Sequence, residues 1–187
     1  MKFDLLRFTA FCAYLAAWLV FAVGAAATGI PRMQRFVEAP ARMKPAVIIG
    51  TVLQIASACV ITFNLGDGPL RPKSFELATV VFLAPFAAAL FVAALRSAPR
   101  RGSKDRLVTS GAYAWVRHPI YLAFFAMLLA TGLLASAGPA LLLSAGMYLA
   151  GCELRIASEE ADLEQTFRGE YEQYRLRTRW RYLPGLR

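Results

Sequence analysis

Four long stretches without a charged residue constrain this chain of 187 residues more than any other feature. They cover residues 8–31, 45–66, 77–95 and 119–152. A helix needs roughly 20 such residues to cross about 30 Å of hydrocarbon, and the first three stretches have about that length. With 58% hydrophobic and only 18% charged residues, the chain is also too apolar for a soluble domain of its size. The sequence therefore predicts an all-α, integral membrane helical bundle.

The fourth stretch predicts a helical hairpin. As one helix its 34 residues would be about 51 Å long, which is too long for a single crossing. Small residues and a proline divide it at 135–139, with the sequence Ala-Ser-Ala-Gly-Pro. We expect two short legs, the second continuing as a helix to Phe167. The prediction is thus about five transmembrane helices, the last two a tight hairpin, followed by a cytoplasmic helical segment. Pro85 predicts a kink in the third span.

Lysine and arginine are unevenly distributed over the predicted connections. When the spans alternate across the bilayer, one side holds 4 of these residues and the other holds 17. Cytoplasmic segments carry the excess of positive charge in multi-pass proteins. We therefore predict an N-terminus on the outer side of the membrane, with the active site and the C-terminus in the cytoplasm.

The net charge of +9 would suggest nucleic acid as a partner of a soluble protein. Here the basic residues lie in short segments between apolar runs, where they meet lipid phosphates. The predicted partner is therefore the lipid bilayer, and no nucleic acid is expected. Cys12, Cys59 and Cys152 are far apart and His118 is the single histidine, so clustered metal ligands are missing and no metal site is predicted. The sequence gives no indication of oligomeric state.

Composition changes near residue 96. Residues 1–96 contain three spans with almost no polar side chain suited to chemistry, and are predicted to be a transmembrane scaffold. Residues 97–187 contain nearly all the candidate functional residues. We therefore predict that the second region is catalytic.

The segment before the hairpin leads from a loop into a helix at the cytoplasmic face. Pro119 suits the first turn of a helix, and it disfavours the helical conformation for His118. The N-terminus of such a helix can hold a carboxylate or a phosphate. Tyr121 lies three residues after His118, so the two side chains can converge. An alternative is that His118 only caps the helix while Trp115 and Tyr121 form an interfacial aromatic belt.

Charged residues follow the last apolar stretch on a helix. Arg155 and Glu159 are spaced to share one face, whereas Glu160 points about 100° away. The alternative is a solvated helix face with an exposed ion pair of little value. The position of Arg155 favours a functional role. It lies only three residues beyond an apolar span, where burying an ionisable group costs free energy.

Aromatic residues alternate with arginines in the C-terminal tail, from Phe167 to Tyr182. This pattern suits the headgroup layer of the membrane. A lid over a site would have the same pattern, so both interpretations stay open.

Taken in order, these segments resemble the isoprenylcysteine carboxyl methyltransferase and phospholipid methyltransferase family of membrane proteins. The resemblance lies in Leu-Val-Thr-Ser-Gly-Ala-Tyr-Ala-Trp-Val-Arg-His-Pro-Ile-Tyr at 107–121, the apolar hairpin, and Arg-Ile-Ala-Ser-Glu-Glu-Ala-Asp-Leu at 155–163. Phe167, Tyr171, Tyr174 and Pro184 complete it, so that it covers roughly residues 105–184. Two departures are Ala123, where the family often has glycine, and Arg168-Gly169, where Gly usually follows the phenylalanine directly.

The resemblance implies a methyltransferase that uses S-adenosylmethionine and releases S-adenosylhomocysteine. Residues implied to bind this cofactor are Leu107, Val108, Tyr113, His118, Pro119, Ile120, Tyr121 and Glu159. Arg155 is implied to bind the methyl acceptor, and Arg155, Glu159 and Glu160 are the predicted catalytic residues. The expected acceptor is lipophilic, most directly an isoprenylcysteine carboxylate that undergoes O-methylation.

Three other functions remain open at this stage. Methylation of a phospholipid amine would require Glu159 or Glu160 as a general base. An NADPH-dependent reductase of sterol-like lipids would have a related Arg-His-Pro-x-Tyr turn, although such proteins tend to have asparagine where this chain has Ile120. The third is a non-catalytic membrane protein of the same fold.

Overall fold

A computed structural model describes residues 4–38, 44–64, 72–97, 106–183 and 185. These residues form only helices and loops, without a strand, which confirms the all-α fold. The elements are α1 (Leu5–Glu38), α2 (Pro45–Asn64), α3 (Ser74–Ser97), a short 3-10 helix η2 (Gly111–Ala114), α4 (Pro119–Leu134) and α5 (Gly138–Arg177). Among the described residues, α1, α2, α3 and α5 are long and apolar enough to cross a membrane, and α4 is a shorter apolar helix of 16 residues.

The predicted hairpin is confirmed. α4 ends at Leu134 and α5 begins at Gly138, with a turn in which the Ala137 N–H donates to the Gly132 carbonyl at 3.0 Å. The two legs approach closely here, because a Cβ on Gly132 would lie 2.5 Å from the Leu141 side chain. The third predicted span lies within α3, which continues as a helix through Pro85, and the predicted kink there stays a prediction.

α5 leaves the bundle as one helix as far as Phe167, as the sequence predicts. Arg168 then has φ 36° and ψ −118°, which breaks the helix before it resumes up to Arg177. A side chain is unfavourable at positive φ, where glycine is preferred. Arg168, which stands where the family pattern usually has glycine, therefore has a strained backbone conformation. The other departure, Ala123, is fully buried among the core residues.

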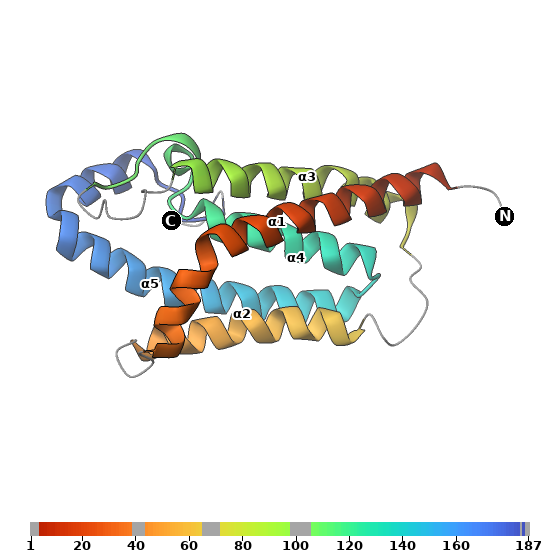
Figure 1. Ribbon diagram of the computed structural model, residues 1–187, viewed down its shortest axis with the longest axis horizontal. Coiled ribbons are helices and arrows are strands. Elements are labelled where there is room, and N and C mark those ends of the chain that lie inside the picture. The colour runs from red at the N-terminus through yellow and green to blue at the C-terminus, as the bar shows by residue number, and fades with distance from the viewer. Residues whose placement is uncertain (1–3, 39–43, 65–71, 98–105, 184, 186–187) are drawn as a thin grey trace.

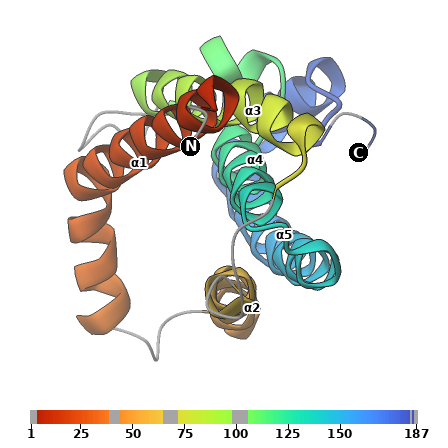
Figure 2. The same ribbon diagram turned by 90° about the vertical axis from the view of Figure 1, so that its right-hand side faces the viewer.

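The helices form a bundle in which α1 packs on α3, α3 on α4, and α2 on α5 (Figures 1 and 2). The core between α1, α3 and α4 consists largely of alanines, with Phe21 stacked on Phe91 at 4.3 Å between ring centroids. Large side chains such as Phe63, Phe82 and Leu142 are more than three-quarters exposed, which suits a lipid environment. The start of α1 and the end of α5 lie at opposite ends of the bundle (Figure 1).

α2 and α5 cross at a pair of glycines. A Cβ on Gly151 would lie 2.6 Å from the Gly50 carbonyl oxygen, and a Cβ on Gly50 would lie 2.7 Å from the Gly151 carbonyl oxygen. Small residues allow such close approach of helices in membranes. Farther along the same interface, the buried Ser144 hydroxyl donates to the Ser57 carbonyl at 2.6 Å. The crossing therefore fixes α2 against the part of α5 that leads to the charged residues.

Candidate active site

The start of α4 is held by the C-terminal tail. His118 precedes the helix with φ −127° and ψ 65°, and Pro119 occupies the first turn, as expected. The N–H of Arg117 donates to the Trp180 carbonyl at 2.9 Å, and the N–H of His118 donates to the Arg181 carbonyl at 2.7 Å. The His118 side chain does not cap the helix and lies beside α5.

Glu160 lies at the centre of a buried group of charges. Its carboxylate is 2.8 Å from Arg117 Nε, 3.4 Å from His118 Nε2 and 3.2 Å from Arg181 Nη2. Burial alone would raise the pKa of Glu160, but hydrogen bonds from His118 and Arg117, and the positive charge of Arg117, outweigh burial and lower this pKa to about 2. Glu160 is therefore an ionised, fully engaged carboxylate rather than part of a solvated helix face.

Arg155 and Glu159 form a second, more open group. Arg155 Nη2 is 3.7 Å from Glu159 Oε1, and its guanidinium lies over the Tyr121 ring, 5.3 Å from the centroid. The Tyr121 hydroxyl donates to Glu159 Oε1 at 2.5 Å, and His118 Nδ1 is 3.6 Å from Glu159 Oε2. Since the Glu159 side chain is 41% exposed, against 9% for Glu160, it is the accessible carboxylate of the pair.

The tail covers this region. The Tyr182 hydroxyl donates to Glu153 at 2.9 Å, and Arg181 reaches the other oxygen of the same carboxylate at 2.8 Å. Arg117 Nη1 donates to the carbonyls of Thr178 and Arg179. Burial, together with the bond to Glu153, raises the pKa of Tyr182 well above its usual value, so the hydroxyl keeps its proton. Of the two interpretations of the tail, these contacts favour a cover over the site.

The structure brings together six of the predicted site residues, which are His118, Pro119, Tyr121, Arg155, Glu159 and Glu160. Ile120 is half-buried and packs against the core of α1, α3 and α4. The other three lie on the segment before α4. Leu107 packs on Tyr171 and Tyr174 beyond the break in α5, the Tyr113 carbonyl accepts from Tyr174 at 2.7 Å, and Val108 is half-buried.

Sequence reasoning assigned no role in the site to several residues that hold it together, which are Gln54, Arg117, Glu153, Arg181 and Tyr182. The sequence did contain a signal that could have identified Arg117 as a site residue, because it stands next to His118 in the most specific part of the sequence pattern. Gln54 had a weaker signal, as a large polar side chain in the middle of an uncharged, mainly apolar stretch. It comes from the region predicted to be scaffold, and its amide oxygen accepts from Arg155 Nη1 at 2.9 Å.

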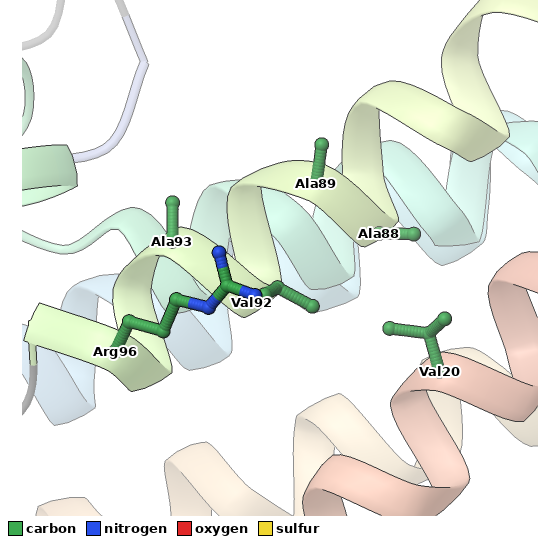
Figure 3. Close-up of a pocket in the computed structure, with 6 residues that line it drawn as sticks. All are labelled: Val20, Ala88, Ala89, Val92, Ala93 and Arg96. Carbon is green, nitrogen blue, oxygen red and sulfur yellow. The ribbon is translucent and has the colours of Figure 1, made fainter.

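Two surface hollows lie outside this group of charges. A groove of about 380 Å³ runs between α1 and α3, where Val20 faces Ala88 and Val92, with Arg96 at one end (Figure 3). A second hollow of about 570 Å³ lies on α5 beside Glu164 and Arg168. Neither is lined by the residues around Glu159 and Glu160.

The fold and the site define a multi-pass helical membrane protein with a buried charged centre at one end of its bundle. Residues 100–165 match the model of the isoprenylcysteine carboxyl methyltransferase family. A similar protein is the protein-S-isoprenylcysteine O-methyltransferase of Schizosaccharomyces pombe, 41% identical over 78 residues. The aligned part covers 42% of this chain and 33% of the relative, so the match spans about a third of the relative's length.

Proposed function

We propose that this chain is an S-adenosylmethionine-dependent methyltransferase that methylates the carboxylate of a lipophilic, isoprenylcysteine-type acceptor. The observation that carries the proposal is the placement of Arg155 beside Tyr121 and Glu159, next to the start of α4. The family match and the name of the fungal relative support the same reaction. The catalytic region would be residues 97–187, with residues 1–96 as the scaffold that supports it.

The residues present fit the proposed cofactor. Its ammonium group requires an accessible carboxylate, and Glu159 provides one that is 41% exposed. Tyr121 and His118 hold that carboxylate from the side of α4. Leu107, Val108 and Tyr113 would contribute apolar and aromatic surface for the rest of the molecule, beside Tyr171 and Tyr174.

S-adenosylmethionine, when bound, supplies a methyl group already activated by its positively charged sulfur. The protein then has to align the acceptor oxygen with that methyl group and exclude water, effects worth several kcal/mol. Arg155 can hold the acceptor carboxylate through charged hydrogen bonds. Its Nε is buried and has no hydrogen-bond partner among the described residues, so the guanidinium keeps donor capacity for a ligand.

Glu160 has a positioning role in this proposal. A general base needs a pKa near the working pH, whereas the pKa of Glu160 is lowered to about 2. This weighs against Glu160 as a base for an amine acceptor. A carboxylate acceptor requires no such base, because it is ionised near neutral pH.

The proposed location is an integral membrane protein with its N-terminus outside and its active site and C-terminus in the cytoplasm. The site lies at the end of the bundle where α5 extends beyond its apolar part and the tail folds back (Figure 1). On the cytoplasmic side this site would meet the cofactor from solution and the acceptor from the bilayer.

Calorimetry with the detergent-solubilised protein tests the proposal directly. S-adenosylhomocysteine should bind with a micromolar dissociation constant, and NADPH, measured in parallel, should not. Transfer of a labelled methyl group to N-acetyl-S-farnesylcysteine then tests the acceptor. Binding of NADPH alone would point to the reductase function, and binding of neither ligand would point to a non-catalytic protein.

A further inference from the structure

Gln54 uses both ends of its side-chain amide at the junction of α2 and α5. Its Oε1 accepts from Arg155 Nη1 at 2.9 Å, and its Nε2 donates to Cys152 Sγ at 3.3 Å. The orientation of the amide follows from chemistry, because a guanidinium only donates and must face the amide oxygen. The oxygen and the nitrogen of the amide therefore both have partners on α5. In this apolar segment an unpaired amide would cost free energy of folding.

The Gly50–Gly151 contact lies one helical turn from the Gln54–Arg155 contact, and together they determine how the amide meets the guanidinium. Gly50 and Gly151 bring the backbones of α2 and α5 together, and a Cβ on Gly50 would also lie 2.7 Å from Arg155 Cγ. Gln54 and Arg155 each follow their glycine by four residues, so they lie on the same side of their helices and face one another. The glycine crossing thus sets the separation that a glutamine side chain spans.

The bond from Gln54 decides where the guanidinium of Arg155 points. Among the described residues, Gln54 makes the shortest polar contact with it, since the nearest Glu159 oxygen is 3.7 Å away and Nε has no partner. The Tyr121 ring supports the guanidinium from one face. Because the amide is neutral, it orients Arg155 without cancelling the positive charge that a carboxylate acceptor would need.

We infer that Gln54 is a positioning residue that orients Arg155 toward the acceptor carboxylate, so that α2 takes part in acceptor binding. The inference rests on the proposed function only in assigning the acceptor to Arg155. It extends the site to a helix outside the region that matches the family model, which begins at residue 100.

Two variants separate orientation from charge. Gln54→Leu removes the hydrogen bond, and Gln54→Glu keeps an oxygen in place but adds a negative charge beside Arg155. The control is Thr62→Val, because Thr62 is exposed on the same helix and, within the part of the chain that the structure describes, its hydroxyl bonds only to the Ala58 carbonyl of its own helix. Steady-state kinetics with N-acetyl-S-farnesylcysteine and calorimetry with S-adenosylhomocysteine are measured for all three.

For Gln54→Leu we expect the acceptor KM to rise about tenfold, with a smaller change in kcat and with cofactor-product affinity within about twofold of the wild type. Gln54→Glu should raise the acceptor KM further, because it neutralises Arg155. Thr62→Val should behave like the wild type. Unchanged acceptor KM in both Gln54 variants would overturn the inference, as would an equal loss of affinity for S-adenosylhomocysteine.

A thermal double-mutant cycle tests the contact without reference to methyl transfer. Gln54→Leu should lower the melting temperature markedly when Arg155 is present and much less in the Arg155→Met background. Additive shifts would overturn the inference. A wild-type protein that methylates no carboxylate would instead contradict the proposed function, and the cycle would still decide whether Gln54 positions Arg155.

Discussion

Arg117 and Glu160 form a buried ion pair, 2.8 Å from Nε to Oε1, that joins the start of α4 to the charged part of α5. Both side chains are less than a tenth exposed. The same arginine also donates to two carbonyls of the tail. Three segments that are far apart in the chain therefore depend on one guanidinium.

Replacing Arg117 with alanine should destabilise the protein by about 3–5 kcal/mol, because a buried carboxylate loses its main partner. Thermal unfolding in detergent measures the effect. Lys44→Met is the matched control, since Lys44 and Asp162 form an ion pair in which both side chains are more than half exposed. Such a pair contributes about 0–1 kcal/mol. Equal shifts in melting temperature for the two variants would show that burial does not make the Arg117–Glu160 pair more stabilising than the exposed pair.

Glu160 should make stability depend on pH in the acid range. Its pKa is lowered from 4.5 to about 2 in the folded protein, so its contribution is fully present above pH 4.5 and is lost as the pH falls toward 2. The expected loss is about 3 kcal/mol. Melting temperatures between pH 6 and pH 2.5 should fall more steeply for the wild type than for Glu160→Gln. Parallel curves would mean that Glu160 has an ordinary pKa.

Arg155 and Glu159 should affect different steps although their side chains are neighbours. Arg155→Ala should lower kcat/KM for the acceptor about 10- to 100-fold, with affinity for S-adenosylhomocysteine nearly intact. Glu159→Ala should weaken the binding of S-adenosylhomocysteine in calorimetry. Glu164→Gln, an exposed change on the same helix, serves as the control. Unchanged affinity in Glu159→Ala would return that residue to a solvated helix face.

The glycine crossing between α2 and α5 should be intolerant of even one methyl group. Gly151→Ala would place a Cβ 2.6 Å from the Gly50 carbonyl oxygen, so the helices must separate and the melting temperature should fall. Gly146→Ala on the same helix meets nothing within 4 Å and should be neutral or stabilising by up to about 1 kcal/mol. A similar loss in both variants would show that the helix, rather than the crossing, is sensitive.

Arg168→Gly should stabilise the protein. Arg168 has φ 36°, a conformation that costs a residue with a side chain about 1–3 kcal/mol. Relief of this strain should raise the melting temperature by a few degrees for a chain of this length. The neighbouring Gly169→Ala is the control, because a Cβ there meets nothing within 4 Å. If only Gly169→Ala raised the melting temperature, the strain would not lie at Arg168.

The parts of this fold that depend on neighbours in sequence could be predicted from the sequence. Charge-free length gave the spans and the hairpin, and a spacing of four residues placed Arg155 beside Glu159. A spacing of three residues likewise predicted that His118 lies near Tyr121, and their ring centroids are 5.8 Å apart.

Contacts across the fold could not be predicted in this way. Gln54 lies 101 residues from Arg155, and nothing near it in sequence indicates its partner. The tail was equally ambiguous, because aromatic residues and arginines suit both a membrane surface and a cover over a site. The tertiary contact that favours the cover joins the buried Tyr182 to Glu153, which lies 29 residues away in the chain.

The brevity of α4 has a consequence for the surrounding membrane. Its 16 residues are about 24 Å long, whereas a typical hydrocarbon core is about 30 Å thick. A short membrane helix is accommodated by local thinning of the bilayer or by flanking residues that reach the interface, at a cost of fractions of a kcal/mol per ångström. The thickness of the surrounding lipid is therefore a physical factor in how the short α4 and its longer neighbours fit one bilayer.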